Sequence, residues 1–243
     1  MLYFHGLDKG VTYTEKRICK SQLCAEFLGS MFLVMASISS MILLVDVLDA
    51  PIGIAVFANA IAVAFVLCAL IEIFRPISGA HFNPVVTMVM LLEGRVSALK
   101  ASLFVLLQFL GGIVGVALSR LMFLNEVGTL LAVSDNIRNE YIFFGEILGT
   151  FILVLTILLL IKVGSNKISI IVGFLVGGQL LSTSSTMFAN PQVTVASMLT
   201  DTTSGIRPID GLVFIAMQLI GALLAYVVYK FIFTNKTYKT EEK

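Results

Sequence analysis

Six stretches of about 20 mostly apolar residues constrain the fold of this chain more than any other feature. A helix needs about 20 such residues to cross the roughly 30 Å hydrocarbon core of a bilayer. Only 13% of the 243 residues are charged, about half the usual share in a soluble domain. The chain is therefore predicted to be an integral membrane protein, one domain over 1–243, with spans at about 24–45, 53–74, 99–120, 142–162, 168–186 and 211–233.

Two segments between the spans each carry an Asn-Pro pair followed by an apolar stretch too short to cross. These stretches are PVVTMVMLL (84–92), after Asn83, and PQVTVASML (191–199), after Asn190. Proline is favoured at the first helical position, where its missing N–H is no loss, and asparagine is a favoured N-cap. We therefore expect each asparagine to begin a short re-entrant helix.

The two halves of the chain repeat each other, with the same order of motifs in each. Three spans per half is an odd number, so the second half enters the membrane inverted, as in many channels and transporters. The halves are predicted at about 20–122 and 140–233. The matched pairs are AEFLGSMFLV (25–34) with GEILGTFILV (145–154), FNPVVT (82–87) with ANPQVT (189–194), and LQFLGGIVG (107–115) with MQLIGALLA (217–225).

The inverted repeat predicts that the two short helices meet near the middle of the membrane by their N-termini. Non-helical backbone at that depth is tolerated only where it packs in protein or lines water. Both positive helix ends would then face one passage, with the amides of Asn83 and Asn190 available to whatever passes. A simpler interpretation is that the two asparagines only cap turns.

Lysine and arginine are distributed unevenly between the two sides of the predicted membrane segments. Of the 16 such residues, only Arg120, Arg138 and Arg207 lie on the side opposite the termini. Cytoplasmic segments carry the excess of positive charge. Both termini are therefore expected in the cytoplasm.

The segment SGAHFNPVVT (78–87) resembles the signature of the major intrinsic proteins, the aquaporins and aquaglyceroporins, and the likeness extends over about 24–233. The resemblance implies an all-α membrane protein of six transmembrane helices plus two re-entrant half-helices. It also implies a homotetramer in the lipid bilayer, each subunit passing water or small neutral solutes such as glycerol and excluding protons and ions.

The motifs at the two asparagines depart from the usual family pattern. The third residue is generally alanine, but the two motifs here are Asn83-Pro84-Val85 and Asn190-Pro191-Gln192. Most members continue the second motif with arginine, which narrows the outer constriction, and Val193 stands there. The resemblance assigns the constriction to Val63, Gln179, Met187 and Val193, so it is predicted to be atypical and to lack arginine.

Three ionisable residues in or near apolar segments allow two interpretations each. Glu26 and Glu146 lie within spans, where a carboxylate is costly and usually has a purpose. They are either proton-relay groups or acceptors for the irregular backbone of the re-entrant turns, and the resemblance favours the second. His81 either lines the mouth of the pore, as the resemblance implies, or caps the turn.

The main alternative to a passive channel is a coupled secondary transporter, because inverted repeats with broken helices serve both. Such a carrier needs titratable groups near the midplane, and only Glu26 and Glu146 qualify. An enzyme is not expected, since the sequence has two histidines and no nucleophile paired with a base. A net charge of +1 argues against a nucleic-acid partner. We predict no cofactor and no metal site.

Overall fold

The structure is a computed structural model that describes residues 18–234. Every regular element within this range is helical. In chain order the elements are α1 (Lys20–Met41), the π-helical turn η1 (Ile42–Val47), α2 (Ile52–Ser78), α3 (Pro84–Leu92), α4 (Ala98–Met122), α5 (Leu124–Val127), α6 (Glu140–Lys162), α7 (Ile168–Ser182), α8 (Pro191–Ser197) and α9 (Pro208–Thr234).

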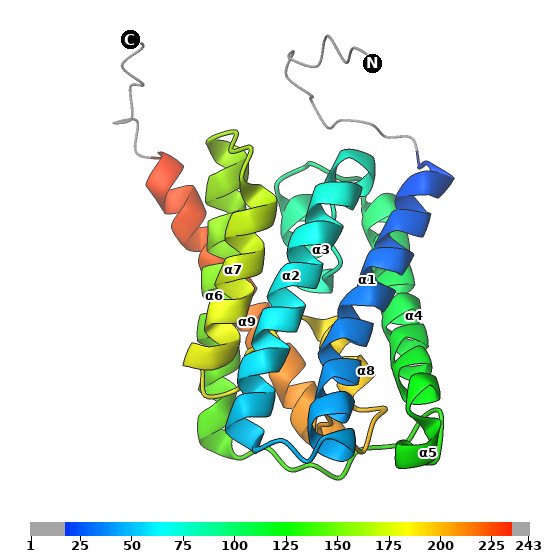
Figure 1. Cartoon of the computed structure of the whole chain (residues 1–243). Coiled ribbons are helices and arrows are strands. Elements are labelled where there is room, and N and C mark those ends of the chain that lie inside the picture. Colours follow the sequence, from blue (N-terminus) through cyan, green and yellow to red (C-terminus); the bar gives the residue numbers. More distant parts are fainter. Residues whose placement is uncertain (1–17, 235–243) are drawn as a thin grey trace.

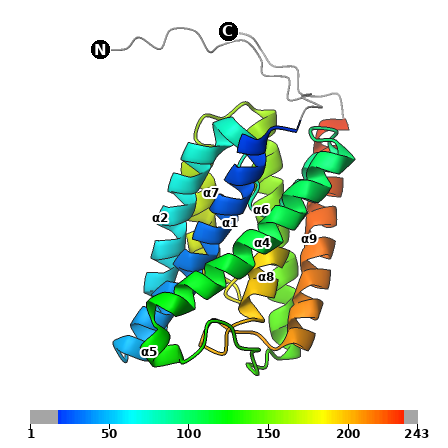
Figure 2. The same cartoon turned by 90° about the vertical axis from the view of Figure 1, so that its right-hand side faces the viewer.

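Long helices form a bundle around the two short helices α3 and α8 (Figures 1 and 2). Helix α1 packs on α4 in the first half, as α6 packs on α9 in the second, and α2 packs on α7 across the two halves. The start of α1 and the end of α9 lie at one end of the bundle, here called the terminal face (Figure 1). The opposite end carries α5 and is called the α5 face.

The predicted all-α bundle is confirmed, with one short member. Five helices among the described residues are long and apolar enough to cross a membrane, but α7 has only 15 residues and is about 22 Å long at 1.5 Å per residue. The predicted span 168–186 is therefore too long. The helix ends at Ser182 because Thr183 adopts an extended backbone and its hydroxyl donates to the Gln179 carbonyl at 2.8 Å.

Glycines allow the paired helices to touch through their backbones. A Cβ on Gly111 of α4 would lie 2.3 Å from the carbonyl oxygen of Phe27, and one on Gly221 of α9 would lie 2.4 Å from that of Ile147. These glycines hold equivalent positions in the two halves. Small residues at such contacts let membrane helices approach closely.

We expect Gly111→Ala to destabilise the bundle, because the added methyl group meets a backbone oxygen that cannot rotate away. Gly178→Ala is the matched control: it also lies inside a helix, but nothing is within 4 Å of a Cβ there. Thermal unfolding in detergent, followed by circular dichroism, should show a lower midpoint for the first variant only. Equal midpoints would contradict the close approach of α1 and α4.

Candidate functional site

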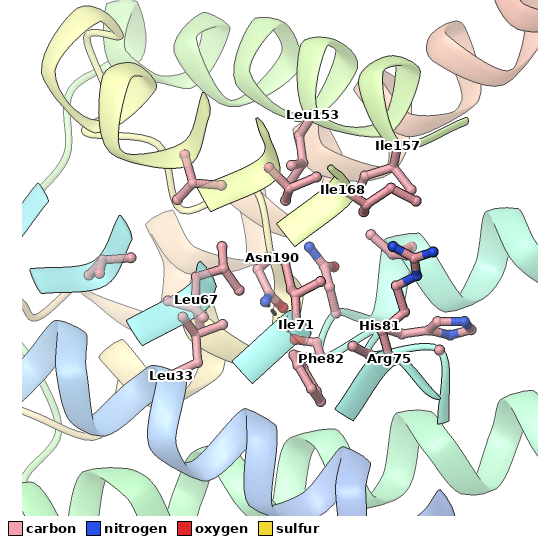
Figure 3. Close-up of a pocket in the computed structure, with 18 of the residues that line it drawn as sticks. Leu33, Leu67, Ile71, Arg75, His81, Phe82, Leu153, Ile157, Ile168 and Asn190 are labelled. Carbon is pink, nitrogen blue, oxygen red and sulfur yellow. Dashed lines mark hydrogen bonds between the residues drawn. The ribbon is translucent and has the colours of Figure 1, made fainter. Parts of the chain in front are cut away.

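A cavity of about 1450 Å³ lies between the two halves and reaches residues of both faces. Figure 3 shows part of its lining. Its walls come from α1, α2, α6 and α7, and both re-entrant segments contribute to it. Asn83 and Asn190 line its middle section, where α3 and α8 approach each other. The described residues include no group of three or more His, Cys, Asp or Glu that could hold a metal ion.

Asn83 and Asn190 join the two re-entrant segments by reciprocal hydrogen bonds. The Asn83 amide Nδ2 donates to the carbonyl of Ala189, and the Asn190 Nδ2 donates to the carbonyl of Phe82, both at 2.8 Å. Each Oδ1 accepts from a backbone N–H of its own half-helix, at 3.0 Å from Val85 and 3.2 Å from Gln192. An amide nitrogen has two hydrogens, so a second donor remains on each side chain.

Pro84 and Pro191 occupy the first positions of α3 and α8, as the sequence predicts. Their fixed φ suits the start of a helix, and their missing N–H would have no partner there. The two half-helices therefore begin at equivalent points, with their positive ends directed toward each other.

The backbone leading into each half-helix is strained in the same way. Ala80 and Phe82 have φ of 54° and 48°, and the equivalent Met187 and Ala189 have φ of 33° and 46°. A left-handed backbone costs a residue with a side chain roughly 1–2 kcal/mol. Matching strain at both sites indicates that the surroundings hold both segments in one required shape.

Glu26 of α1, which is fully buried, accepts hydrogen bonds from the first re-entrant segment. Its Oε1 accepts from the Ser78 hydroxyl at 2.6 Å and from the His81 N–H at 3.0 Å. Its Oε2 accepts from the Phe82 N–H at 2.8 Å and from the Gln108 amide at 2.7 Å. All four donors are neutral, so this is the geometry that the backbone-acceptor interpretation requires.

Glu146 of α6 repeats the arrangement in the second half, again fully buried. It accepts from the backbone N–H groups of Phe188 and Ala189, both at 2.9 Å, and from the Gln218 amide at 2.6 Å. Gln218 also donates to the Thr194 hydroxyl at 2.9 Å, as Gln108 does to its equivalent Thr87. Each carboxylate thus binds one re-entrant segment to the long helices beside it.

Gln192 fits between the two halves because α4 has a glycine opposite it. A Cβ on Gly112 would lie 2.3 Å from the Gln192 Oε1. The Gln192 Nε2 lies 3.4 Å from the Phe82 carbonyl, which also accepts from Asn190. The unusual third residue of the second motif therefore adds to the contact between the re-entrant segments.

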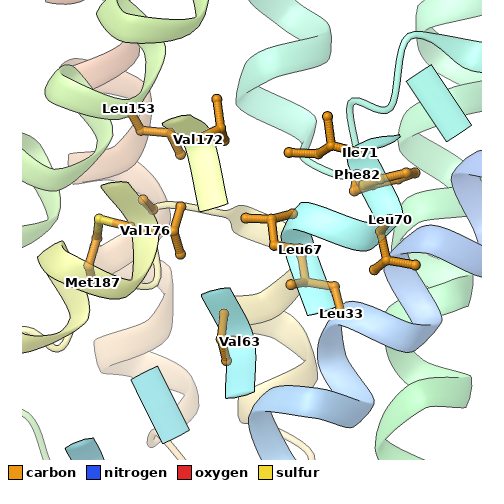
Figure 4. Close-up of a cluster of buried hydrophobic side chains, with 11 residues drawn as sticks. Leu33, Val63, Leu67, Leu70, Ile71, Phe82, Leu153, Val172, Val176 and Met187 are labelled. Atoms are coloured by element: carbon orange, nitrogen blue, oxygen red, sulfur yellow. The ribbon is translucent and has the colours of Figure 1, made fainter. Parts of the chain in front are cut away.

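A cluster of buried hydrophobic side chains forms part of the cavity wall (Figure 4). Val63 and Met187 are buried in one hydrophobic cluster with residues of α1, α2, α6 and α7, and Val193 packs against that cluster. All three line the cavity.

Gln179 does not line the cavity, in contrast to the prediction. Helix α7 presents Val172, Val176 and Leu180 to it, and Gln179 lies one residue away from this stripe, with its Oε1 buried and without a hydrogen bond. The family resemblance assigned Gln179 to the constriction, whereas the four-residue spacing of a helix decides which side chains face inward.

His81 lies on the cavity wall toward the terminal face, close to Arg75 (Figure 3). Its Nδ1 is 3.1 Å from the Thr87 hydroxyl, and its ring packs edge-on against Phe104. The side chain is thus anchored to α3 and α4 while it lines the cavity, and both interpretations of His81 agree with this position.

Arg138 is a lining residue that sequence reasoning did not identify. It precedes α6 on the α5 face, and its guanidinium lies over the Phe188 ring at 5.9 Å. Burial lowers the pKa of Arg138, whereas the charges of Glu146 and Asp210 raise it. The only signal in the sequence was that few cations occur on this side of the predicted membrane.

Comparisons with known proteins agree on one family. The model of the family described as "Major intrinsic protein" matches residues 13–186. Aquaglyceroporin AqpS of Rhizobium meliloti (strain 1021) is 37% identical over 209 residues, 86% of this chain and 88% of that protein. Glycerol uptake facilitator protein-like 6 of Lactiplantibacillus plantarum is 37% identical over 140 residues, 55% of this chain and 60% of that protein.

The fold is also similar to a solved structure. The X-ray structure of the aquaglyceroporin from Plasmodium falciparum superposes with a TM-score of 0.61 at 16% identity, covering 89% of this chain and 96% of that one. At this level of identity the likeness concerns the fold alone.

We expect Glu146→Gln to destabilise the protein, because the amide offers one acceptor oxygen where the carboxylate now receives three hydrogen bonds. Each buried donor left unpaired costs about 1–3 kcal/mol. Glu140→Gln, an exposed change in the first turn of the same helix, is the control. Thermal unfolding in detergent should separate the two variants. An unchanged midpoint for Glu146→Gln would show that the carboxylate does not hold the segment.

Proposed function

Because the chain belongs to the major intrinsic protein family, we propose that it is a passive membrane channel for water and small uncharged solutes such as glycerol. The observation that carries the proposal is the pair Asn83 and Asn190, which join two half-helices end to end inside a cavity that reaches both faces. The names of the aquaglyceroporin and glycerol-facilitator relatives support glycerol as a solute.

A neutral polyol would find donors and acceptors along one side of this path. The spare N–H groups of Asn83 and Asn190 are the donors. The structure records no hydrogen bond from a described residue to the carbonyls of His81 and Phe188, two residues that line the cavity, so these are acceptors. The opposite walls are apolar and suit the carbon atoms of the solute.

Cations would meet a barrier where α3 and α8 converge. Each helix N-terminus is equivalent to roughly half a positive charge, and two of them face the same point. Glu26 and Glu146 do not cancel this charge in the path, because neither lines the cavity and both are occupied with backbone donors. We propose that protons and metal cations are excluded at the asparagines.

The constriction toward the α5 face is proposed to be wide and apolar. We assign Val63, Met187 and Val193 to it, since all three line the cavity, together with Val176 and Leu180 of α7 in place of the expected Gln179. Without an arginine at position 193, this ring favours solutes larger than water. Water crossing it would find few partners, and an unmatched polar group costs roughly 1–3 kcal/mol.

The orientation and assembly are part of the same proposal. Arg75, Arg95 and Lys100 line the cavity toward the terminal face, which we place in the cytoplasm on the basis of the positive charge there. The ends of the chain, 1–17 and 235–243, lie outside the described residues. A homotetramer in the bilayer is proposed from family membership.

Purified protein in liposomes tests the channel against the coupled carrier. A channel should pass glycerol only down its gradient, and collapsing the proton and sodium gradients with ionophores should leave the rate unchanged. Stopped-flow light scattering measures glycerol and water, and a trapped pH dye measures protons. Uphill accumulation of glycerol that ionophores abolish would instead establish a transporter.

Asn190→Asp should weaken the exclusion of cations, because a carboxylate offsets the positive helix ends that it faces. Its Oδ1 still accepts from the Gln192 N–H, so α8 keeps its cap. The control is Asn139→Asp, which adds the same charge at the exposed start of α6. Sodium or proton leak should rise in the first variant alone while glycerol still passes. An unchanged leak would rule out the electrostatic barrier.

A further inference from the structure

All charged side chains that line the cavity among the described residues are cationic. Arg75, Arg95 and Lys100 lie toward the terminal face, and Arg138 lies toward the α5 face. No aspartate or glutamate of the described chain lines this surface. A concave surface with one sign of charge concentrates ions of the other sign.

The backbone of Arg138 is held in place at the α5 face. Its N–H donates to the Asp210 Oδ2 at 2.9 Å. Two residues earlier, the Asn136 amide donates to the Thr202 carbonyl at 2.8 Å, and the Asn136 carbonyl accepts from the Arg207 N–H at 2.8 Å. The connection before α6 is thereby tied to the connection before α9.

The guanidinium of Arg138, in contrast, has unused donors. Its Nε is buried without a hydrogen bond, and its Nη2 makes one long contact, 3.4 Å to the Gly205 carbonyl. No described carboxylate is within ion-pair distance, since the nearby Asp210 pairs with Arg207. Arg120 on the same face shows the other extreme, with hydrogen bonds from all three guanidinium nitrogens.

Hydroxyl groups complete the surroundings of Arg138. Thr203 and Ser204 line the cavity on the α5 face, and Ser204 directly precedes the Gly205 that Arg138 contacts. Phe188 supports the flat side of the guanidinium. A supported guanidinium fork with free N–H groups and neighbouring hydroxyls matches a planar carboxylate, which it can bind through two parallel hydrogen bonds.

We propose that Arg138, with Thr203 and Ser204, forms a binding site for small carboxylates at the α5-face mouth of the cavity. The positive charge that an arginine at position 193 would carry is then supplied by Arg138, in the connection before α6. The site rests on the proposed function in one respect only: a carboxylate held there stands in the proposed path and should slow glycerol.

The first test measures binding without transport. Malonate and its uncharged diamide, malonamide, have similar shapes and differ in charge, so any preference for malonate reports a cation. Ligands that bind only the folded state raise the unfolding midpoint. In detergent, millimolar malonate should raise the midpoint of the unmodified protein more than malonamide does. Arg138→Gln should remove that difference, and Lys162→Gln, which removes one positive charge at an exposed position outside the cavity, should keep it.

The second test measures glycerol uptake into liposomes. External malonate should inhibit uptake at a concentration about tenfold lower than malonamide, which is the lower end of what one charge-assisted hydrogen bond contributes. Arg138→Gln should bring the two inhibitors within about twofold of each other, and Lys162→Gln should not. If Arg138→Gln does not fold, Arg138→Lys replaces it in both tests. Lysine keeps the positive charge but lacks the planar guanidinium, so this variant should bind malonate more weakly.

The two readouts separate the site from the channel. The site is overturned if malonate stabilises and inhibits no better than malonamide. It is also overturned if malonate acts on Arg138→Gln as strongly as on the unmodified protein, a result that would point to the cations at the terminal face. An unchanged malonate affinity in Arg138→Lys overturns it as well. If glycerol does not pass at all while the midpoint shift depends on Arg138, the channel proposal fails and the carboxylate site stands.

Discussion

Hydrogen bonds from backbone N–H groups to two buried carboxylates support everything else in this structure. A chain that leaves its helix inside a membrane exposes polar groups that no lipid can satisfy. Glu26 and Glu146 receive those groups in the two re-entrant segments. Because the carboxylates hold strained backbone in one shape, the half-helices can begin where they do, and the asparagines can meet between them.

The two halves differ in how the residue after Asn-Pro is packed. In the first half, Val85 packs with Ala222 of α9 in a buried hydrophobic cluster. In the second, Gln192 needs the extra space that Gly112 leaves on α4. The family match also ends at residue 186, just before the second motif. The two half-helices thus differ in the residue that follows Asn-Pro, while the capping asparagine and the carboxylate partner are the same in both halves.

The sequence predicted those parts of the structure that depend on local chemistry or on repetition. Asn-Pro capping located the starts of α3 and α8, and the repeated Glu and Gln motifs lie on helices that pack together, α1 on α4 and α6 on α9. Features that depend on how elements face one another were missed. The rotation of α7 turns Gln179 away from the cavity. Arg138 reaches the cavity because hydrogen bonds to distant residues hold the connection before α6 in place. The identity of a residue does not reveal such three-dimensional placement.

The reciprocal bonds between the asparagines and the opposite carbonyls have a consequence for the order of events during synthesis. When the first three long helices have emerged, the amide of Asn83 and the carbonyl of Phe82 have no partner, because Ala189 and Asn190 are still to be made. Unpaired polar groups inside a membrane are unstable. The first half therefore cannot satisfy these groups by itself, and its re-entrant segment gains its full set of hydrogen bonds only once residues 189 and 190 are present.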